Sequence, residues 1–540
     1  MLRATELSMY VGREPLFEGV GLTLSPGDRV GLVGPNGTGK STLLRILAAE
    51  LAPSSGTVTR SPGLRVAWHQ QESPDPCLPV GHFVRSGAPT LTAAQARVRE
   101  IERQMQDAVG DQRHLARAYA LAVDVFDAAG GWAAQARQEE VRSRLGVAVE
   151  GGIASDRPMG SLSGGEQARV MLARLLLDDA GSGNTTLLLD EPTNHLDTEG
   201  RQWLESYLGR FTGAVLAVSH DRRFLDRTVH RIVELDGIST TLQNYPGCGY
   251  TAYRIEREAR WQRLLLDFET QERYRQRLAL DIQRTREQAR EVELANPRNP
   301  GARRYAKKVA RKALSRERRL DRQMQAASWV SRPETRPRLV LAFTEREAMP
   351  ADPDAMAPLP SIEVQAGGRV LFRGTTVRIG PADRILLSGR NGAGKTSLLR
   401  ALEPHLRAAV VLPQTHQHLP AAATTLEYFR SQVPMYEPDA EEVLRGFLFD
   451  DLELLRRIGG LSVGQLRRLL FAVMVNTPSR LLVLDEPTNH LDFDALDVVE
   501  RALTQYRGAL LVVSHDEEFA DRIGITRRWR IDRGRLDTSG

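Results

Sequence analysis

Cysteine is almost absent from this chain of 540 residues: Cys77 and Cys248 are its only two. Two thiols so far apart in the sequence exclude a disulfide framework and a cysteine-rich zinc or iron–sulfur site. Apolar runs are also short, and none approaches the ~18–20 residues needed to span a bilayer. The amino terminus, MLRATELSMY, lacks the basic and then apolar order of a secretory signal. We therefore expect a cytoplasmic protein with no membrane-embedded part.

The chain also lacks a strong overall charge, because 73 lysines and arginines face 68 acidic residues, for a formal net charge of +5. One stretch departs from this balance: residues 301–322, GARRYAKKVARKALSRERRLDR, hold ten basic and two acidic residues. The chain length corresponds to about three or four domains. The basic stretch is therefore a local feature, and its role depends on what flanks it.

Three motifs occur twice, in the same order. The first copies are GLVGPNGTGKSTLLRIL at 31–47, LLLDEPTNHLD at 187–197 and LAVSHDRRFLDR at 216–227. The second copies are LLSGRNGAGKTSLLRAL at 386–402, LVLDEPTNHLD at 482–492 and LVVSHDEEFADR at 511–522. A repeat of this length predicts two homologous domains in tandem.

The repeat sets the domain organisation. We predict two α/β domains, 1–245 and 340–540, joined by a linker at 246–339. In each half a short apolar run leads into a glycine-rich loop and then a helix-like segment. Buried strands of this kind belong to parallel sheets, which place their ligands at the carboxyl ends of the strands.

Both glycine-rich loops fit the pattern G-x-x-x-x-G-K-[ST]. Glycines let the backbone curl so that N–H groups face phosphate oxygens, and the following helix adds its positive end. Lys40 and Lys395 should reach the β- and γ-phosphates, while Ser41 and Thr396 should ligate Mg²⁺. The other residues expected around ATP are Gly34, Asn36, Gly37, Gly39, Thr42, Gly389, Asn391, Gly392, Gly394 and Ser397.

Acidic pairs end the apolar runs of the second motif. Asp190 and Asp485 suit the Mg²⁺ shell. Glu191 and Glu486, one residue further on, suit a base that orients or deprotonates the attacking water. The sequence thus predicts one hydrolytic centre in each domain.

Two further side-chain types complete each predicted centre. His220 and His515 follow an apolar run and are placed to sense the γ-phosphate. Gln71 and Gln414 are the glutamines expected to contact metal or water. Gln70, one position earlier in the chain, is the alternative to Gln71.

A fourth motif begins a helix in each half, as LSGGEQ at 162–167 and LSVGQ at 461–465. A serine followed by backbone amides at a helix start is an anion-binding geometry. The residues expected to contact nucleotide here are Ser163, Gly164, Gly165, Glu166, Ser462, Gly464 and Gln465.

Together these motifs resemble those of ATP-binding-cassette ATPases over about 400 residues. DEPTNHLD twice in one chain, with a charged linker and no membrane domain, resembles the ABC-F family in particular. The resemblance implies two nucleotides held between two domains, each on one domain's glycine-rich loop and the other domain's LSGGQ-type helix. It also implies a monomer whose two domains pair within the chain, and binding to the ribosome beside the exit-tRNA site.

The sequence departs from the family pattern at two places. Val463 stands where LSGGQ has a glycine, and its Cβ would hinder close approach to the nucleotide on Lys40. Tyr10 resembles the family's adenine-stacking aromatic, whereas the matching position in the second half is Gln365. We therefore expect the two ATP sites to be unequal.

Apolar residues recur at near-heptad spacing in 250–332, before and after the helix-breaking sequence NPRNPG. We predict an antiparallel helical hairpin whose legs, at roughly 30–45 residues, extend about 45–70 Å. The expected contact stripe is Trp261, Leu264, Phe268, Leu278, Ile282 and Val292 against Val309, Ala313, Leu320 and Met324. Pro297, Pro300 and Gly301 should interrupt the helix between them.

Positive charge gathers at the turn and in the returning leg of this hairpin. Residues 251–340 hold 24 basic and 12 acidic residues, so their net charge of +12 leaves −7 for the rest of the chain. Arginine-rich segments bind phosphate backbones. The expected RNA-binding residues are Arg298, Arg303, Arg304, Lys307, Lys308, Arg311, Lys312, Arg316, Arg318 and Arg319.

A solvated coiled coil, or an acidic protein or membrane surface as partner, stays possible on the charge alone. The family resemblance narrows the partner to large-subunit rRNA and peptidyl-tRNA near the peptidyl-transferase centre.

The first half carries about 44 extra residues around 88–135. AAQARVREIERQMQDAV in this stretch predicts an exposed helix, which resembles the arm of the family and implies contact beside the exit site. The alternative is an enlarged helical subdomain without a partner.

Within ABC-F, protection of the ribosome against antibiotics competes with a housekeeping role in translation, and the asymmetric second half favours protection. The energising subunit of a membrane transporter and a DNA-repair or structural ATPase are more distant alternatives. They do not account for a long basic hairpin between the two ATPase domains.

Overall fold

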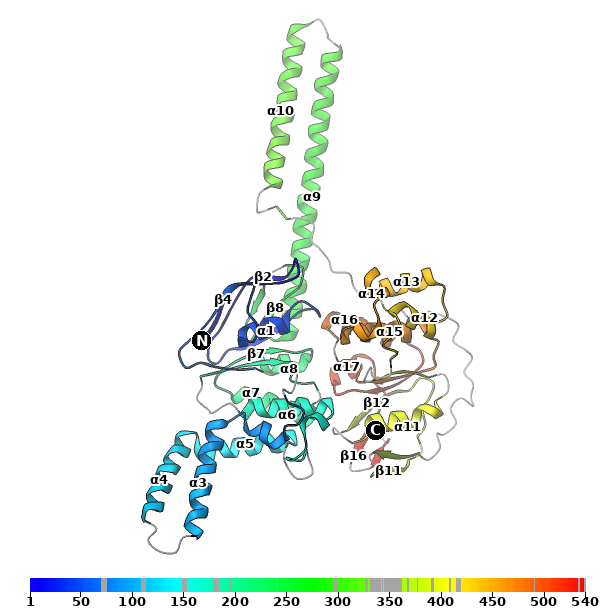
Figure 1. Cartoon of the computed structure of the whole chain (residues 1–540). Helices are drawn as coiled ribbons and strands as arrows, with labels where there is room; N and C mark the ends of the chain where they lie inside the picture. Colours follow the sequence, from blue (N-terminus) through cyan, green and yellow to red (C-terminus); the bar gives the residue numbers. More distant parts are fainter. Residues whose placement is uncertain are drawn as a thin grey trace. The chain divides into compact units, whose positions relative to one another are not determined.

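The computed structural model describes most of the chain, and Figure 1 shows it. The residues outside the description are 69–74, 108–112, 148–152, 178–183, 195, 240, 296–298, 326–328, 331–340, 342, 344–361, 367–368, 376, 390–392, 407–408, 414–418, 490, 533–534 and 539–540. The chain forms two compact units. The larger comprises Met1–Tyr250 and Pro337–Gly540, and the smaller comprises Thr251–Arg336.

A six-stranded sheet organises the first half of the larger unit. Its order is β5-β6-β7-β3-β8-β9, in which the first five strands are parallel and β9 is antiparallel. The strands are β3 (Arg29–Val33), β5 (Arg65–Trp68), β6 (Thr185–Asp190), β7 (Ala214–Val218), β8 (Arg231–Glu234) and β9 (Gln243–Pro246). Every residue of β3, β6 and β7 is buried, as expected for central strands covered on both faces.

An antiparallel sheet, β2-β1-β4, shares a core with that sheet through helix α1. Its strands are β1 (Leu2–Val11), β2 (Glu14–Leu24) and β4 (Ser55–Arg60). The helices of this half outside the arm are α1 (Lys40–Ala48), α2 (Val80–Arg85), α6 (Gly164–Leu177), α7 (Thr198–Arg210) and α8 (Arg222–Thr228). We call this half the first cassette.

The second half repeats the plan, with a six-stranded sheet in the order β13-β14-β15-β12-β16-β17 and a β10-β11 ribbon. The strands are β10 (Ile362–Ala366), β11 (Arg369–Thr375), β12 (Arg384–Gly389), β13 (Ala409–Leu412), β14 (Leu481–Asp485), β15 (Ala509–Val513), β16 (Arg527–Asp532) and β17 (Arg535–Asp537). The helices are α11 (Lys395–Leu402), α12 (Thr425–Gln432), α13 (Glu437–Gly446), α14 (Asp451–Leu455), α15 (Val463–Asn476), α16 (Phe493–Gln505) and α17 (Glu517–Arg522). Two copies of one α/β plan confirm the predicted fold class, and we call this half the second cassette.

The extra segment of the first cassette is a helical arm. It consists of α3 (Pro89–Asp107) and α4 (Arg113–Ala128), which lie side by side, followed by α5 (Gly131–Leu145). Their shared core contains Leu91, Ala94, Val98, Ile101, Ala122, Phe126 and Ala134. The sequence predicted the first of these helices, and the structure adds the antiparallel partner that buries its apolar face.

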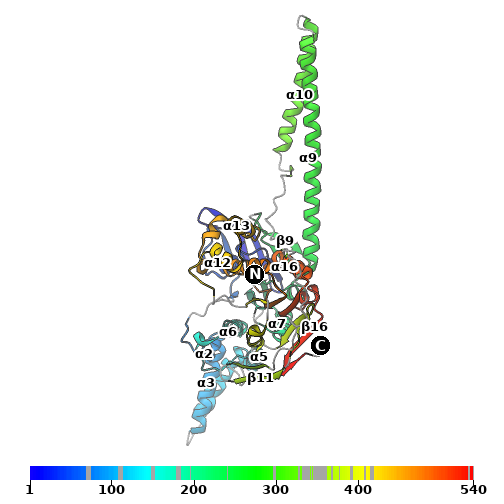
Figure 2. The same ribbon diagram turned by 90° about the vertical axis from the view of Figure 1, so that its right-hand side faces the viewer.

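The smaller unit is a helical hairpin made by α9 (Tyr250–Ala295) and α10 (Pro300–Met324), which run side by side in Figures 1 and 2. The buried stripe consists of Ile282, Ala289, Ala306, Ala313 and Leu320. Alanines every seven residues let the two backbones approach closely. Ion pairs join Arg286 to Glu317 and Arg316 to Asp281 across the legs.

The predicted hairpin differs from the structure in detail. Leu264 and Met324 are exposed and not part of the stripe. The second leg has 25 residues, shorter than predicted. The predicted break is confirmed, because α9 ends at Ala295 and α10 begins at Pro300; Pro300 and Gly301 are the first residues of α10, where the missing N–H of proline costs no hydrogen bond. Pro297 lies outside the described residues.

No helix in the described part of the chain combines the length and apolarity that crossing a membrane requires. Both cysteines carry free thiols.

Candidate ATP sites

The first glycine-rich loop connects β3 to α1 and depends on its glycines. A Cβ at Gly34, where φ is +148°, would lie 2.1 Å from the carbonyl oxygen of Leu235. At Gly39, φ +91°, it would lie 2.7 Å from the Leu16 side chain. Gly37 also has positive φ but faces open space. The loop therefore packs tightly against its cassette at Gly34 and Gly39, while the backbone at Gly37 is open to the approach of a phosphate chain.

The two loop lysines lie over their own loop backbones. Lys40 Nζ donates to the carbonyl oxygens of Gly34, at 2.7 Å, and Pro35, at 2.8 Å. Lys395 Nζ donates to the carbonyl oxygen of Gly389 at 2.8 Å and lies 3.1 Å from His515 Nε2. Both lysines are largely buried, and burial lowers the pKa of Lys395. Each places a cation where the loop amides would hold phosphate.

The predicted metal ligands meet in pairs. Thr396 Oγ1 donates to Asp485 Oδ2 at 2.9 Å, and Ser41 hydrogen-bonds to Asp190. Burial raises the pKa of both aspartates, and these hydrogen bonds act against that rise. Among the described residues, nothing hydrogen-bonds to the buried Asp485 Oδ1.

These pairs fit Mg²⁺ bound together with nucleotide. A hydroxyl and a carboxylate supply hard oxygen ligands, and Mg²⁺ at nucleotide sites takes few protein ligands and completes its shell with phosphate oxygens and water. Among the described residues, no group of three or more histidine, cysteine, aspartate or glutamate side chains could hold a metal ion.

The two predicted bases adopt a strained backbone. Glu191 and Glu486 have φ of 49° and 48°, a left-handed conformation that non-glycine residues rarely adopt. This conformation turns each side chain toward the histidine of its own cassette. His220 Nε2 lies 3.4 Å from Glu191 Oε1, and His515 Nε2 lies 3.5 Å from Glu486 Oε1.

Burial dominates the electrostatics of these bases. It raises the pKa of Glu191 to about 8, with a further rise from Asp190. It raises the pKa of Glu486 to about 7, where the positive charges of Arg201 and Lys395 act in the opposite direction. Burial also lowers the pKa of His515 to about 3, so this imidazole is neutral and accepts from Lys395. Groups that titrate near neutrality suit general-base chemistry.

At the helix starts of the fourth motif, side chains of the motif itself form the capping hydrogen bonds. Ser163 Oγ donates to Glu166 at 2.9 Å, and Arg157 holds Glu166 at 2.8 Å. In the second cassette Ser462 and Gln465 form a capping box. Gly164 and Gly165 lie in the first turn of α6, and Val463 and Gly464 lie in the first turn of α15. Val463 is 45% exposed, so its methyl groups face outward from the second cassette.

The remaining predicted residues lie at the edges of the two sites or outside the described chain. Gln70, Gln71, Gln414, Asn391, Gly392 and Arg298 lie outside the described residues. Tyr10 is an exposed residue of β1, and its hydroxyl donates to Glu18 at 2.6 Å. Gln365 pairs with Val370 in the β10-β11 ribbon. Thr42 and Ser397 lie in the first turns of α1 and α11, beside the loop lysines.

Sequence reasoning missed the aspartates that end DEPTNHLD. Asp492 Oδ1 caps α16 by accepting from Ala495 N, while its Oδ2 accepts from the backbone N of Asn36 at 3.0 Å. Asp197 caps α7, and its negative charge acts against the lowering of the Lys395 pKa by burial. Each glycine-rich loop is therefore next to an aspartate of the other cassette. An aspartate directly before a helical segment was the available signal.

A second missed contact joins α8 of the first cassette to α16 and α17 of the second. Arg222 is 3% exposed and lies 2.8 Å from both Asp497 and Glu500. Arg223 lies 2.7 Å from Glu517. In the repeat, Arg222-Arg223 aligns with Glu517-Glu518. The two related helices thus carry opposite charges, a difference that the aligned motifs already contained.

The loops, acidic pairs and paired sheets define a tandem ATPase of the ATP-binding-cassette class. The family model described as "ABC transporter" matches residues 17–194 and 372–489. The chain belongs to this family of ATPases, and within it to the ABC-F proteins.

Its relatives match over nearly the whole chain. It is 35% identical over 526 residues to "Tylosin resistance ATP-binding protein TlrC" of Streptomyces fradiae, covering 93% of this chain and 92% of that protein. It is 31% identical over 542 residues to "ABC transporter F family member 5" of Arabidopsis thaliana, and the match covers 95% of this chain and 72% of that protein. From the matched ATPase domains and these relatives, we conclude that the protein is an ATP-hydrolysing enzyme.

Solved structures share the fold at low sequence identity. The "RNase-L Inhibitor" structure is 18% identical with a TM-score of 0.53, and the match covers 97% of this chain and 87% of that one.

Proposed function

We propose that this protein is a ribosome-binding ATPase that protects translation from an antibiotic. The similarity to a tylosin resistance protein, over 92% of that protein's length, is the observation that carries the proposal. The protein would act in the cytoplasm as a monomer, with its two cassettes paired within one chain.

The hairpin supplies the surface proposed to contact RNA. Nine of the ten predicted basic residues lie on α10, and all nine are exposed. Across the described residues, only Arg316 among these nine forms an ion pair with a carboxylate. Exposed cations along one helix attract a phosphate backbone and release its counterions on binding. We propose that α10 contacts large-subunit rRNA or peptidyl-tRNA, and that α3 and α4 of the arm contact the ribosome elsewhere.

ATP would control this binding through the paired cassettes. Bound Mg²⁺, held by Ser41 and Asp190 or by Thr396 and Asp485, would offset negative charge on the phosphates. Lys40 and Lys395 would hold the β- and γ-phosphates, and Tyr10 would stack on the adenine in the first site. The helix starts at Ser163 and Ser462 would each contact the nucleotide on the opposite loop.

Hydrolysis would then favour release. Glu191 and Glu486 would orient the attacking water, each beside its histidine, with Gln71 and Gln414 contacting metal or water. Loss of the γ-phosphate removes interactions that exist only when the two cassettes are closed on the nucleotides. ATP favours this closed form because it binds the closed form more tightly than the open one.

Expression in an antibiotic-sensitive bacterial host tests the proposal. We expect growth at raised concentrations of one class of ribosome-targeting antibiotic, tylosin-like macrolides included in the panel. The Glu191→Gln Glu486→Gln double variant should give no protection at equal expression. A chain that binds ribosomes but protects against no drug in the panel would instead be a housekeeping translation factor.

A further inference from the structure

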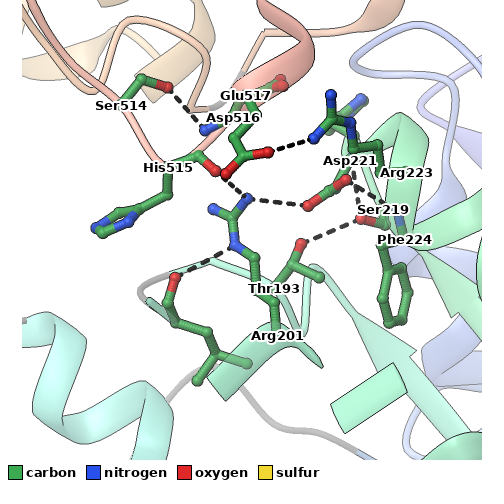
Figure 3. A network of polar contacts seen from close by, with 12 residues as sticks. Thr193, Arg201, Ser219, Asp221, Arg223, Phe224, Ser514, His515, Asp516 and Glu517 are labelled. Carbon is green, nitrogen blue, oxygen red and sulfur yellow. Dashed lines mark hydrogen bonds and ion pairs between the residues drawn. The ribbon is translucent and has the colours of Figure 1, made fainter. Parts of the chain in front are cut away.

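Arg201, which lies outside every repeated catalytic motif, reaches from one cassette into the catalytic centre of the other (Figure 3). It belongs to α7 of the first cassette and is mostly buried, at 16% side-chain exposure. Its Nη1 lies 3.0 Å from Asp221 Oδ2 and 3.2 Å from the backbone carbonyl oxygen of His515, to which it donates. Its Nε donates to the carbonyl oxygen of Leu196 at 3.2 Å. One planar guanidinium therefore links the segment after His220 to the backbone of His515.

The second cassette has no arginine at the position equivalent to Arg201. Aligning DTEGR at 197–201 with DFDAL at 492–496 places Leu496 at the position of Arg201. Leu496 is 1% exposed and belongs to the apolar core of its cassette. A leucine has no donor, so this position of α16 gives no cation to the centre of Glu191 and His220.

A second arginine is directed at the same centre from within its own cassette. Arg467 is 1% exposed and donates to the carbonyl oxygens of Pro413, at 2.7 Å, and Glu486. Counted from the helix-capping serines, the matching residue in the first cassette is Ala168. The backbone of Glu486 is thus held from inside the second cassette, and that of His515 is held from the first.

We propose that Arg201 is a cross-cassette positioning residue for hydrolysis at the second site, formed by Lys395, Glu486 and His515. By fixing the carbonyl of His515, it sets the imidazole beside Glu486 and makes this site sensitive to cassette pairing. The first site works without an equivalent group. The inference concerns ATP hydrolysis and holds whatever the cellular role of the protein.

Variants in which only one site hydrolyses ATP separate the effect of Arg201 on the second site from its effect on the first. In Glu191→Gln only the second site hydrolyses ATP, and in Glu486→Gln only the first does. We expect Arg201→Leu to lower kcat about tenfold in the Glu191→Gln background, as loss of one charge-assisted hydrogen bond would. In the Glu486→Gln background the change should stay within about twofold, because in the first cassette Arg201 bonds the Asp221 carboxylate, whose other oxygen still caps α8, and not the backbone of His220.

Arg223→Gln is the matched control, because Arg223 also pairs across the cassettes but does so with the α17 carboxylates Glu517 and Asp521 instead of the backbone of His515. It should affect both backgrounds equally. Arg201→Lys keeps the charge and one donor, so it should recover part of the lost rate. If Arg201→Leu does not fold, Arg201→Gln, which keeps a donor without the charge, takes its place.

Hydrogen exchange of the nucleotide-free protein gives a readout that does not depend on turnover. Peptides covering 511–520 should exchange faster in Arg201→Leu than in Arg223→Gln. Equal losses of activity in both backgrounds would overturn the proposal, as would unchanged exchange at 511–520 or a loss confined to the Glu486→Gln background. Each result would leave Arg201 as an ordinary interface residue.

Discussion

Arg222 of the first cassette and Glu500 of the second lie 2.8 Å apart, and both side chains are almost completely buried. Asp497 also lies 2.8 Å from Arg222, and a second arginine, Arg522, pairs with both carboxylates. Burying an ion pair contributes little to stability by itself, but removal of one partner leaves an uncompensated charge in a medium that solvates it poorly. The pairing of the cassettes therefore depends on charge complementarity between α8 of the first cassette and α16 of the second.

Glu500→Gln should destabilise the larger unit severely, because it leaves Arg222 buried with less opposing charge. The expected loss is about 3 kcal/mol, measured as a shift of the urea unfolding curve. Arg227→Gln is the control: Arg227 lies on the same helix as Arg222, and its ion pair with Glu205 is 56% exposed on the arginine side. Surface pairs contribute about 0–1 kcal/mol. Equal losses in the two variants would mean that the buried pair has no special role.

The stability of the nucleotide-free protein should fall as pH rises from 6.5 to 8.5. Glu191 and Glu486 have folded pKa values of about 8 and about 7, above the ordinary value of 4.5, so the folded state binds more protons in this range. His515, whose pKa is lowered from 6.5 to about 3, is neutral in the folded protein, so it opposes this trend only near pH 6.5, where the unfolded imidazole still binds protons.

The Glu191→Gln Glu486→Gln double variant should flatten this dependence, measured as Tm across the same pH range. A wild-type Tm that rises toward pH 8.5 would show that these carboxyls ionise freely in the folded protein.

The first ATP site should gain activity from Val463→Gly. Val463 occupies the first turn of α15, where its exposed side chain would stand between the helix start and the nucleotide on Lys40. Removing the Cβ gives the backbone closer access to phosphate. We expect a severalfold higher ATPase rate in the Glu486→Gln background, where only this site works. A lower rate there would assign Val463 a supporting role in that site.

Local motifs made the arrangement of residues at the candidate ATP sites predictable. A glycine-rich loop between a buried strand and a helix fixes the relative positions of Lys40 and Ser41 within a few residues of chain. The pairs Asp190–Glu191 and Asp485–Glu486 end central strands of their sheets, so parallel pairing brings them to the edge where the loops lie. These arrangements follow from short-range geometry that the sequence contains.

Contacts between distant segments were not predictable in this way. Arg201 and His515 are 314 positions apart, and Arg222 and Glu500 are 278 apart. Nothing in the spacing of either pair indicates that they meet. Two alanines of the hairpin stripe, Ala289 and Ala306, were missed for another reason: mostly large apolar residues were expected at the contact, whereas close backbone approach favours alanine.

Neutralising α10 should weaken binding to ribosomes and reduce its dependence on salt. Replacing Arg303, Arg304, Lys307 and Lys308 with glutamine should lower the slope of log K against log salt by about 0.7–0.9 for each phosphate that the helix no longer neutralises. A variant with Arg303→Lys and Arg304→Lys keeps the charge and should keep the slope. An unchanged slope after neutralisation would mean that α10 does not bind RNA.

Co-sedimentation of the Glu191→Gln Glu486→Gln double variant with ribosomes is the most direct test of ATP-controlled ribosome binding. This variant should bind ATP without hydrolysing it and should pellet with ribosomes in ATP, but much less in ADP or without nucleotide. Failure to pellet in ATP, or equal pelleting in all three conditions, would contradict the coupling of nucleotide to ribosome binding.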